Sequence, residues 1–93
     1  MQEELREMLE RAAAVLKEYG VKEVYVFGSA ASDRFDEDSD IDLAVSGLPP
    51  GVFFEAMGRA TQAVHRQVHL VKLDRPNPFT DYLKEKGKLV RVA

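Results

Sequence analysis

Gly28 and Ser29 come directly after residues 21–27 (VKEVYVF), a run of β-branched and aromatic residues that predicts a strand. A glycine at the end of a strand lets the backbone come close to a ligand, and a turn that begins a helix presents backbone N–H groups to an anion. The Ser29 hydroxyl can also donate a hydrogen bond to a phosphate oxygen. An ordinary turn with Ser29 as a helix N-cap would have the same sequence, so the pair alone does not establish phosphate binding.

Asp40 and Asp42 form a second candidate site. Ten residues separate Ser29 from Asp40, and the alternation of polar and apolar residues over 40–46 predicts a strand with both carboxylates on one face. Two carboxylates side by side repel each other unless a cation lies between them, and Mg²⁺ takes oxygen ligands of this kind together with substrate phosphates. An edge strand with a solvated acidic face would show the same pattern.

Taken together, the Gly-Ser pair, the ten-residue gap and the Asp-x-Asp motif resemble the signature of the DNA polymerase β-type nucleotidyltransferase superfamily. The text VFGSA followed by DSDIDLAV is similar to its smallest members, the minimal MntA-like nucleotidyltransferases. Residues 84–90 (KEKGKLV) resemble the Glu-x-Gly and hydrophobic tail that end these proteins. The resemblance covers nearly the whole chain and implies a single minimal nucleotidyltransferase domain over residues 1–93.

The resemblance implies a role for each residue of the motif. Gly28 and Ser29 would hold the triphosphate of an incoming nucleotide. Asp40 and Asp42 would be catalytic and would hold the metal, Mg²⁺ or alternatively Mn²⁺. The reaction implied is transfer of a nucleoside monophosphate to a hydroxyl group, with AMP from ATP as the first expectation and another NTP as the alternative.

His69 departs from the pattern of this family. Active members carry an acid on the next strand, where it binds one metal ion and helps to deprotonate the attacking hydroxyl, whereas residues 67–73 (QVHLVKL) hold His69 at the aligned position. An imidazole can accept a proton, so His69 is the third candidate catalytic residue, but it suits Mg²⁺ poorly. It could equally be an ordinary residue of the sheet surface. We expect no zinc site from His65 and His69, because a change from helix to strand falls between them.

The elements that must position these residues follow from the hydrophobic pattern. Apolar residues at three- and four-residue spacing predict helices over residues 2–19, 52–66 and 79–86, with a short helical turn over 30–34. Strands are predicted over 21–27, 40–46 and 67–73, with a short strand or extended arm over 88–92. The expected fold class is α+β, a small mixed β-sheet flanked by helices. The resemblance implies the polymerase β-like nucleotidyltransferase version of it.

Composition excludes several other classes of protein. The 93 residues include no cysteine, which excludes a disulfide framework, a thiolate zinc site and a cysteine nucleophile. No apolar run approaches the ~20 residues of a membrane span, and no signal peptide is visible, so we expect a cytoplasmic protein that does not enter a membrane. The net charge of −3 argues against direct binding of nucleic acid. Residues 33–42 hold six carboxylates and one arginine, either a solvated acidic loop or part of a metal site.

These observations leave three candidate functions. The first is a nucleotidyltransferase, and because the chain has no room for an acceptor-binding domain, the acceptor must come from a partner or from a second copy of the chain. Minimal members of the family pair with a small helical HEPN-type protein, which implies an antitoxin that modifies a tyrosine of its partner toxin. The alternative is a degenerate member that binds nucleotide or the partner without catalysis. The third is a plain α+β scaffold with an acidic loop.

Overall fold

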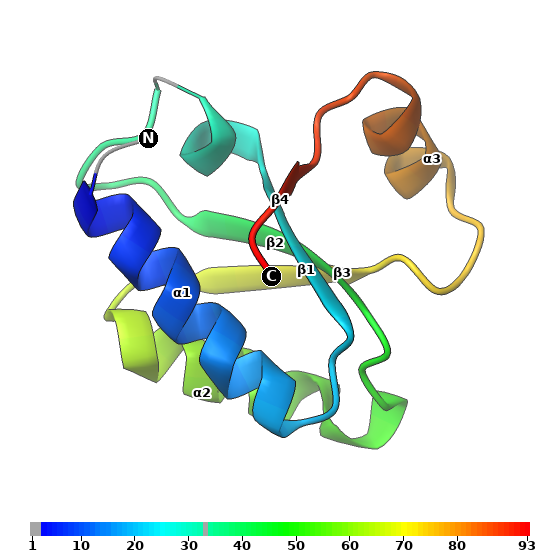
Figure 1. Ribbon diagram of the computed structural model, residues 1–93, viewed down its shortest axis with the longest axis horizontal. Coiled ribbons are helices and arrows are strands. Elements are labelled where there is room, and N and C mark those ends of the chain that lie inside the picture. The colour runs from blue at the N-terminus through cyan, green and yellow to red at the C-terminus, as the bar shows by residue number, and fades with distance from the viewer. Residues whose placement is uncertain (1–2, 33) are drawn as a thin grey trace.

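Four strands form one mixed sheet in the order β3–β2–β1–β4, which crosses the middle of the molecule in Figure 1. The computed structural model describes residues 3–32 and 34–93. In chain order the elements are α1 (Glu3–Glu18), β1 (Glu23–Phe27), the 3₁₀ turn η1 (Gly28–Ala31), β2 (Ile41–Ser46), the 3₁₀ turn η2 (Pro50–Val52), α2 (Phe53–Val64), β3 (Val68–Lys72), α3 (Pro78–Glu85) and β4 (Val90–Arg91). In this part of the chain, no helix is long and apolar enough to cross a membrane.

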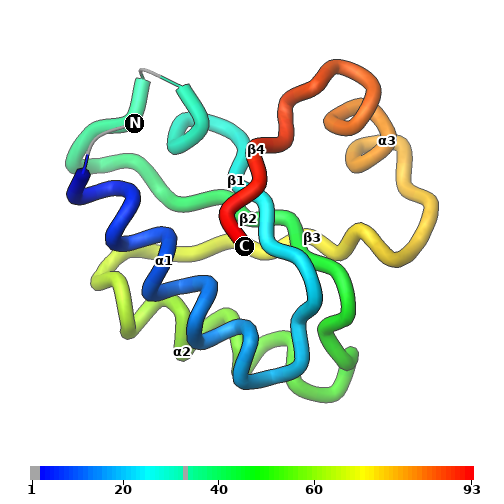
Figure 2. The backbone as a smooth tube through the Cα atoms, in the orientation of Figure 1, coloured from blue at the N-terminus to red at the C-terminus, as the bar shows by residue number. Residues whose placement is uncertain are grey.

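The pairing of the strands brings the two motif segments together. β1 and β2 are antiparallel, with Phe27 opposite Asp42, while β2 and β3 are parallel, with Asp42 beside His69. Parallel strands need a long crossover, and α2 provides it between β2 and β3. β4 pairs with β1 from the other side, and beyond it the Val24 amide donates to the Ala93 carbonyl, so the C-terminal residues run beside β1 (Figure 2). The mixed sheet predicted from the sequence is confirmed.

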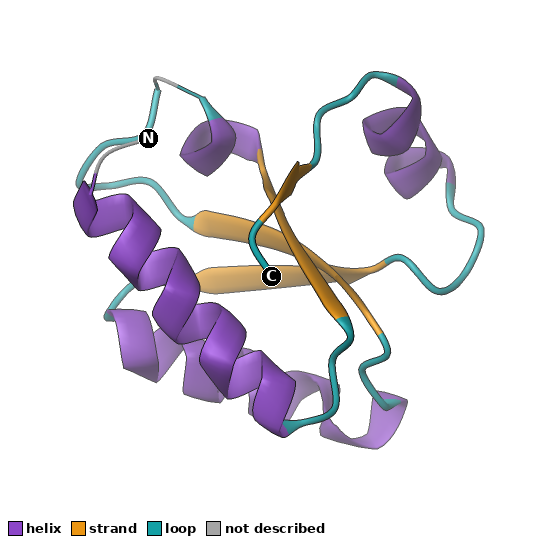
Figure 3. Ribbon diagram, viewed as in Figure 1, coloured by secondary structure: helices purple, strands orange, loops and turns teal. Residues whose placement is uncertain are grey.

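Helices α1 and α2 cover one face of the sheet and form the main core with it (Figure 3). The buried face of α1 repeats every three or four residues, as its sequence predicts, and Leu9 and Leu16 are almost completely buried. Ile41, Leu43 and Val45 of β2 point to the same side. Removing one such leucine side chain from water contributes about 2 kcal/mol, so this layer supplies most of the apolar stabilisation.

Helix α3 packs on the opposite face, where the buried layer is much thinner. A small cluster of Phe27, Ala44 and Leu83 joins this helix to β1 and β2. The helix begins after Asn77, whose side-chain oxygen accepts from the backbone N–H of Phe79 at 2.8 Å, with Pro78 in the first helical position. Helix α3 covers only part of this face, and its residues line the two hollows described below.

Several boundaries differ from those predicted. The turn after β1 starts at Gly28 rather than at residue 30, and β4 is only two residues long. Helix α2 ends at Val64, because His65 adopts a left-handed backbone (φ 57°) and the chain turns toward β3 there. The backbone N–H of Val68 then donates to the Thr61 hydroxyl at 3.0 Å, which joins the start of β3 to this helix.

Candidate active site

The turn after β1 lies against the Asp42 carboxylate. Gly28 has φ +70°, a left-handed conformation that glycine adopts without strain. A Cβ atom at this position would lie 2.6 Å from Asp42 Oδ2, much closer than real Cβ contacts allow. The glycine therefore makes the turn possible and also leaves the space that the carboxylate fills. The structure thus brings together the Gly-Ser pair and the second acid of the Asp-x-Asp motif.

Asp42 is half-buried on the sheet face opposite the main core, between Phe27 and His69 in the register. Burial raises the pKa of its carboxyl group above the ordinary value, the nearby His69 opposes this rise, and the negative charge of Asp40 adds to it. A carboxylate with a raised pKa is stabilised when a cation approaches. The site is therefore electrostatically suited to a positively charged ligand.

His69 lies beside the first acid of the motif. Its Nε2 atom is 3.0 Å from Asp40 Oδ2, and about half of each side chain is exposed. This contact follows from the parallel pairing of β2 and β3, which sets His69 next to Asp42 and within reach of Asp40. The residue at the position of the third acid is thus in the site, and its chemical role stays a prediction.

Asp40 and Asp42 are the two carboxylates of this site that could take part in holding a metal ion. Among residues 3–32 and 34–93, no three His, Asp or Glu side chains form a group that could hold a metal ion by themselves. Asp74, the acid that follows β3, instead accepts a hydrogen bond from the Gly47 backbone at 3.0 Å. Asp40 and Asp42 fit Mg²⁺, which commonly uses one or two protein carboxylates and completes its coordination with water and substrate phosphates.

Arg66 holds the acidic loop that leads into Asp40. Its Nη1 atom donates to the carbonyl oxygens of Asp36 (2.7 Å) and Ser39 (2.8 Å), and its guanidinium group lies 4.6 Å from the centre of the Phe35 ring. Within the loop, the Asp38 backbone N–H donates to Asp36 Oδ1. Asp33, another of the six acids counted in the sequence, lies outside the described residues. Sequence reasoning missed Arg66, since no local pattern marks a residue that bonds to carbonyls nearly thirty positions away.

A cleft of about 780 Å³ opens beside the Gly-Ser turn, between η1 and the segment from α3 to β4. Gly28 and Ser29 lie in its wall. Sequence reasoning missed the other polar and aromatic residues of the wall: Ser32, Arg34, Phe79, Tyr82 and Lys88. Volumes of roughly 300–1,000 Å³ are typical of small-molecule sites, so this cleft is large enough for a nucleotide.

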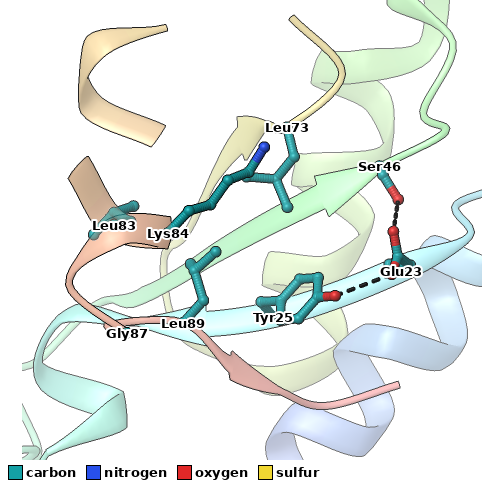
Figure 4. A pocket seen from close by; sticks show the side chains of 8 residues that line it. All are labelled: Glu23, Tyr25, Ser46, Leu73, Leu83, Lys84, Gly87 and Leu89. Carbon is teal, nitrogen blue, oxygen red and sulfur yellow. Dashed lines mark hydrogen bonds between the residues drawn. The ribbon is translucent and has the colours of Figure 1, made fainter. Parts of the chain in front are cut away.

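A smaller hollow of about 390 Å³ lies on the other side of Leu83 and Gly87, which line both cavities (Figure 4). One end of it is closed by Glu23, whose carboxylate accepts hydrogen bonds at 3.0 Å from Tyr25, Ser46 and Arg91. The bonds from Tyr25 and Ser46 lower the pKa of Glu23, with Arg91 adding to the effect. This network joins β1, β2 and β4, and none of the motif residues lines the hollow.

Comparisons with known proteins concern the fold and the family of the chain. The family model described as "Polymerase beta, Nucleotidyltransferase" matches residues 10–91. In a crystal structure of a toxin–antitoxin with AMP-PNP, a chain has a TM-score of 0.76 and 20% identity over 91% of this chain and 72% of that one. A chain in the structure of the tri-AMPylated Shewanella oneidensis HEPN toxin in complex with MNT antitoxin has a TM-score of 0.70 and 18% identity, over 96% of this chain and 71% of that one. A chain in the crystal structure of the toxin–antitoxin MntA–HepT has a TM-score of 0.68 and 19% identity, over 92% of this chain and 69% of that one.

None of the curated proteins matches the chain. At these identities the solved structures show the fold alone, and together with the family model they confirm the predicted α+β fold of the polymerase β type. The family model is the stronger finding, because it spans most of the chain and includes the Gly-Ser turn, the Asp pair and His69. This chain belongs to the polymerase β-type nucleotidyltransferase family.

Proposed function

We propose that this protein transfers AMP from ATP to a hydroxyl group in a Mg²⁺-dependent reaction, and that the acceptor is a tyrosine of a HEPN-type toxin. The observation that carries the proposal is the close approach of the Gly28 turn to Asp42. It supports a site in which the turn would hold phosphate beside a carboxylate that would hold the metal ion. The similar structures support the finer points, since one holds AMP-PNP and another contains a tri-AMPylated HEPN toxin with its antitoxin.

Each candidate site residue would have a separate role in this reaction. Ser29 would donate to a phosphate oxygen, and Asp40 and Asp42 would hold Mg²⁺, which when bound neutralises charge on the phosphate oxygens. In the neutral tautomer that donates from Nε2 to Asp40, His69 keeps Nδ1 free to accept a proton. The acceptor oxygen would bond to the α-phosphorus, pyrophosphate would leave, and the hydroxyl proton would pass to His69 Nδ1.

A second candidate function rests on the same histidine. A site with two carboxylates and an imidazole has one negative charge fewer than a site with three acids, and Asp40 already bonds to His69. Such a site would hold a second metal ion weakly. The alternative is therefore a module that binds nucleotide and the partner protein without transferring AMP.

The experiment that separates these functions uses α-labelled ATP, Mg²⁺ or Mn²⁺, and each HEPN-type protein encoded in the genome that carries this sequence. The enzyme should label a tyrosine of its partner, and Asp42→Asn should abolish labelling. His69→Asp should raise Mg²⁺-supported labelling about tenfold if the missing ligand limits the rate, and Mn²⁺ should narrow that difference. A wild-type chain that binds ATP but labels no partner under any of these conditions would be the binding module.

A further inference from the structure

Exposed apolar side chains gather around the cleft beside Ser29. In the described part of the chain the large exposed hydrophobic residues are Phe54, Phe79, Tyr82 and Val90, and the last three line this one cleft. About half of the Phe79 and Tyr82 side chains is accessible to solvent. Clustered apolar surface on a small protein commonly marks a binding site, so this wall of the cleft is a candidate ligand surface.

The Phe79 ring packs beside the Gly-Ser turn, and Tyr82 lies on the same helix. Phe79 packs edge-to-face on Phe27, with 5.6 Å between ring centres, and Phe27 is the residue directly before Gly28. Tyr82 follows Phe79 by three positions on α3, so both side chains lie on the same side of the helix. Any ligand held at Ser29 therefore has an aromatic surface within the same cleft.

Tyr82 differs from the other two tyrosines in its hydrogen bonding. The Tyr19 hydroxyl donates to Glu55 and the Tyr25 hydroxyl donates to Glu23, both within the protein. The Tyr82 hydroxyl makes no hydrogen bond with the residues that the structure describes. Its ring and its hydroxyl are thus both available to a ligand in the cleft.

Cationic side chains complete the wall. Arg34 and Lys88 line the cleft together with Ser29, and within residues 3–32 and 34–93 Lys88 forms no ion pair. A cleft with cations and a hydroxyl beside an aromatic surface is complementary to a molecule with an anionic chain and a flat ring system. A nucleoside triphosphate has both parts, whereas inorganic triphosphate has only the first.

We infer that Phe79 and Tyr82 form the surface on which the base of the nucleotide stacks, while Lys88 and Arg34 face its phosphates. The inference rests on the proposed function, which needs nucleotide binding at Ser29, and adds the element that recognises the base. Stacking tolerates every base, because each has a π face. We therefore expect ATP and GTP to bind similarly and both to bind more tightly than CTP, whose smaller ring covers less of the surface.

The test compares the binding of ATP and of inorganic triphosphate in Mg²⁺ by isothermal titration calorimetry. Tyr82→Ala should weaken ATP binding about tenfold, which is the size of one lost stacking contact, and should leave triphosphate binding unchanged. Phe79→Leu should act in the same direction while keeping an apolar contact with Phe27. The matched control is Phe54→Ala on α2, which removes an exposed ring outside the cleft and should change neither affinity.

The cations provide a second, independent comparison. Lys88→Ala should weaken the binding of both ATP and triphosphate, whereas Lys84→Ala, in the neighbouring hollow, should weaken neither. If Tyr82→Ala and Phe79→Leu bind ATP like the wild type, or lose ATP and triphosphate equally, the stacking surface is not there and the inference is wrong. A wild-type chain that binds neither molecule would instead contradict the proposed function itself.

Discussion

Because Gly28 has no Cβ atom, the Gly-Ser turn can lie against Asp42, which belongs to the other half of the motif. Alanine there would meet Asp42 Oδ2 at 2.6 Å and would have to adopt φ +70°. We expect Gly28→Ala to lose about 1–2 kcal/mol of unfolding free energy from the backbone strain and the displaced carboxylate. ATP binding should fall by more than about tenfold, because Asp42 can no longer lie beside the turn. Calorimetric titration and thermal unfolding measure the two effects.

The control for this variant is Gly20→Ala. Gly20 also has a positive φ, +94°, but a Cβ atom there would meet nothing within 4 Å, and the residue lies in the turn that follows α1. Gly20→Ala should unfold at a lower temperature than the wild type because of backbone strain, and it should bind ATP with the affinity of the wild type. Loss of ATP binding in both variants would assign the effect to stability alone and would remove Gly28 from the site.

Asp42 makes a prediction about pH. Its folded-state pKa is raised, mainly by burial, so the ionised form destabilises the fold and the protonated form does not. In EDTA at pH 7 we expect Asp42→Asn to be more stable than the wild type by at most about 0.5 kcal/mol, because solvent screens this half-buried group. The difference should shrink as the pH falls through the folded pKa and should vanish below the ordinary value of 3.8. Denaturant unfolding at several pH values measures the difference in stability between the two proteins. A difference that grows as the pH falls would contradict the prediction.

At the scale of the elements, Arg66 joins the connection between α2 and β3 to the loop before β2. Arg66→Ala removes the donors to the Asp36 and Ser39 carbonyls and the stacking on Phe35. We expect a loss of about 1–2 kcal/mol in unfolding free energy, since two backbone acceptors lose a charged donor. AMP transfer should also fall, because Asp40 directly follows this loop. Unfolding curves and the labelling assay measure the two.

Arg59→Ala is the matched control, because Arg59 lies on α2, shortly before Arg66 in the chain, and forms an exposed ion pair with Glu18 at 3.4 Å. It should cost less than about 1 kcal/mol and leave transfer unchanged. Should Arg66→Ala transfer AMP as fast as Arg59→Ala does, the loop does not position Asp40.

How well the sequence predicts an element depends on how local its signals are. The helices and strands follow from periodicity along the chain, and β2 shows it clearly, with Ile41 and Leu43 in the main core and Asp42 on the other face. The family resemblance implied that the Gly-Ser turn and the Asp pair act in one site, and the structure brings the turn against Asp42. The contact between His69 and Asp40 depends on the register of two parallel strands, and the lining of the cleft depends on where α3 docks. No local pattern encodes either.

At the scale of the whole molecule, the two faces of the sheet are packed very unequally. Helix α1 alone buries five residues in the main core, whereas α3 buries only Thr80 and Leu83 on the opposite face. Cooperative units with little buried apolar surface open with lower free energies than the rest of a protein. The helix that carries Phe79 and Tyr82 is therefore expected to open separately from the main core, so that the wall of the cleft is the least stable part of the fold.

Amide hydrogen exchange tests this difference with two matched leucine substitutions. Leu9→Ala in the main core should lower the exchange free energies of α1 and β2 by about 3 kcal/mol. It should leave the exchange free energy of α3 unchanged, because the main core is intact whether α3 is closed or open, so both states lose the Leu9 contacts equally. Leu83→Ala removes the one leucine that fastens α3, so the amides of this helix should lose protection while those of α1 and β2 stay protected. ATP, if it stacks on α3, should slow exchange in this helix, because the nucleotide must leave before α3 opens. Equal exchange free energies for α3 and β2 in the wild type would show instead that both faces of the sheet open as one unit, in which case the nucleotide would meet a rigid cleft.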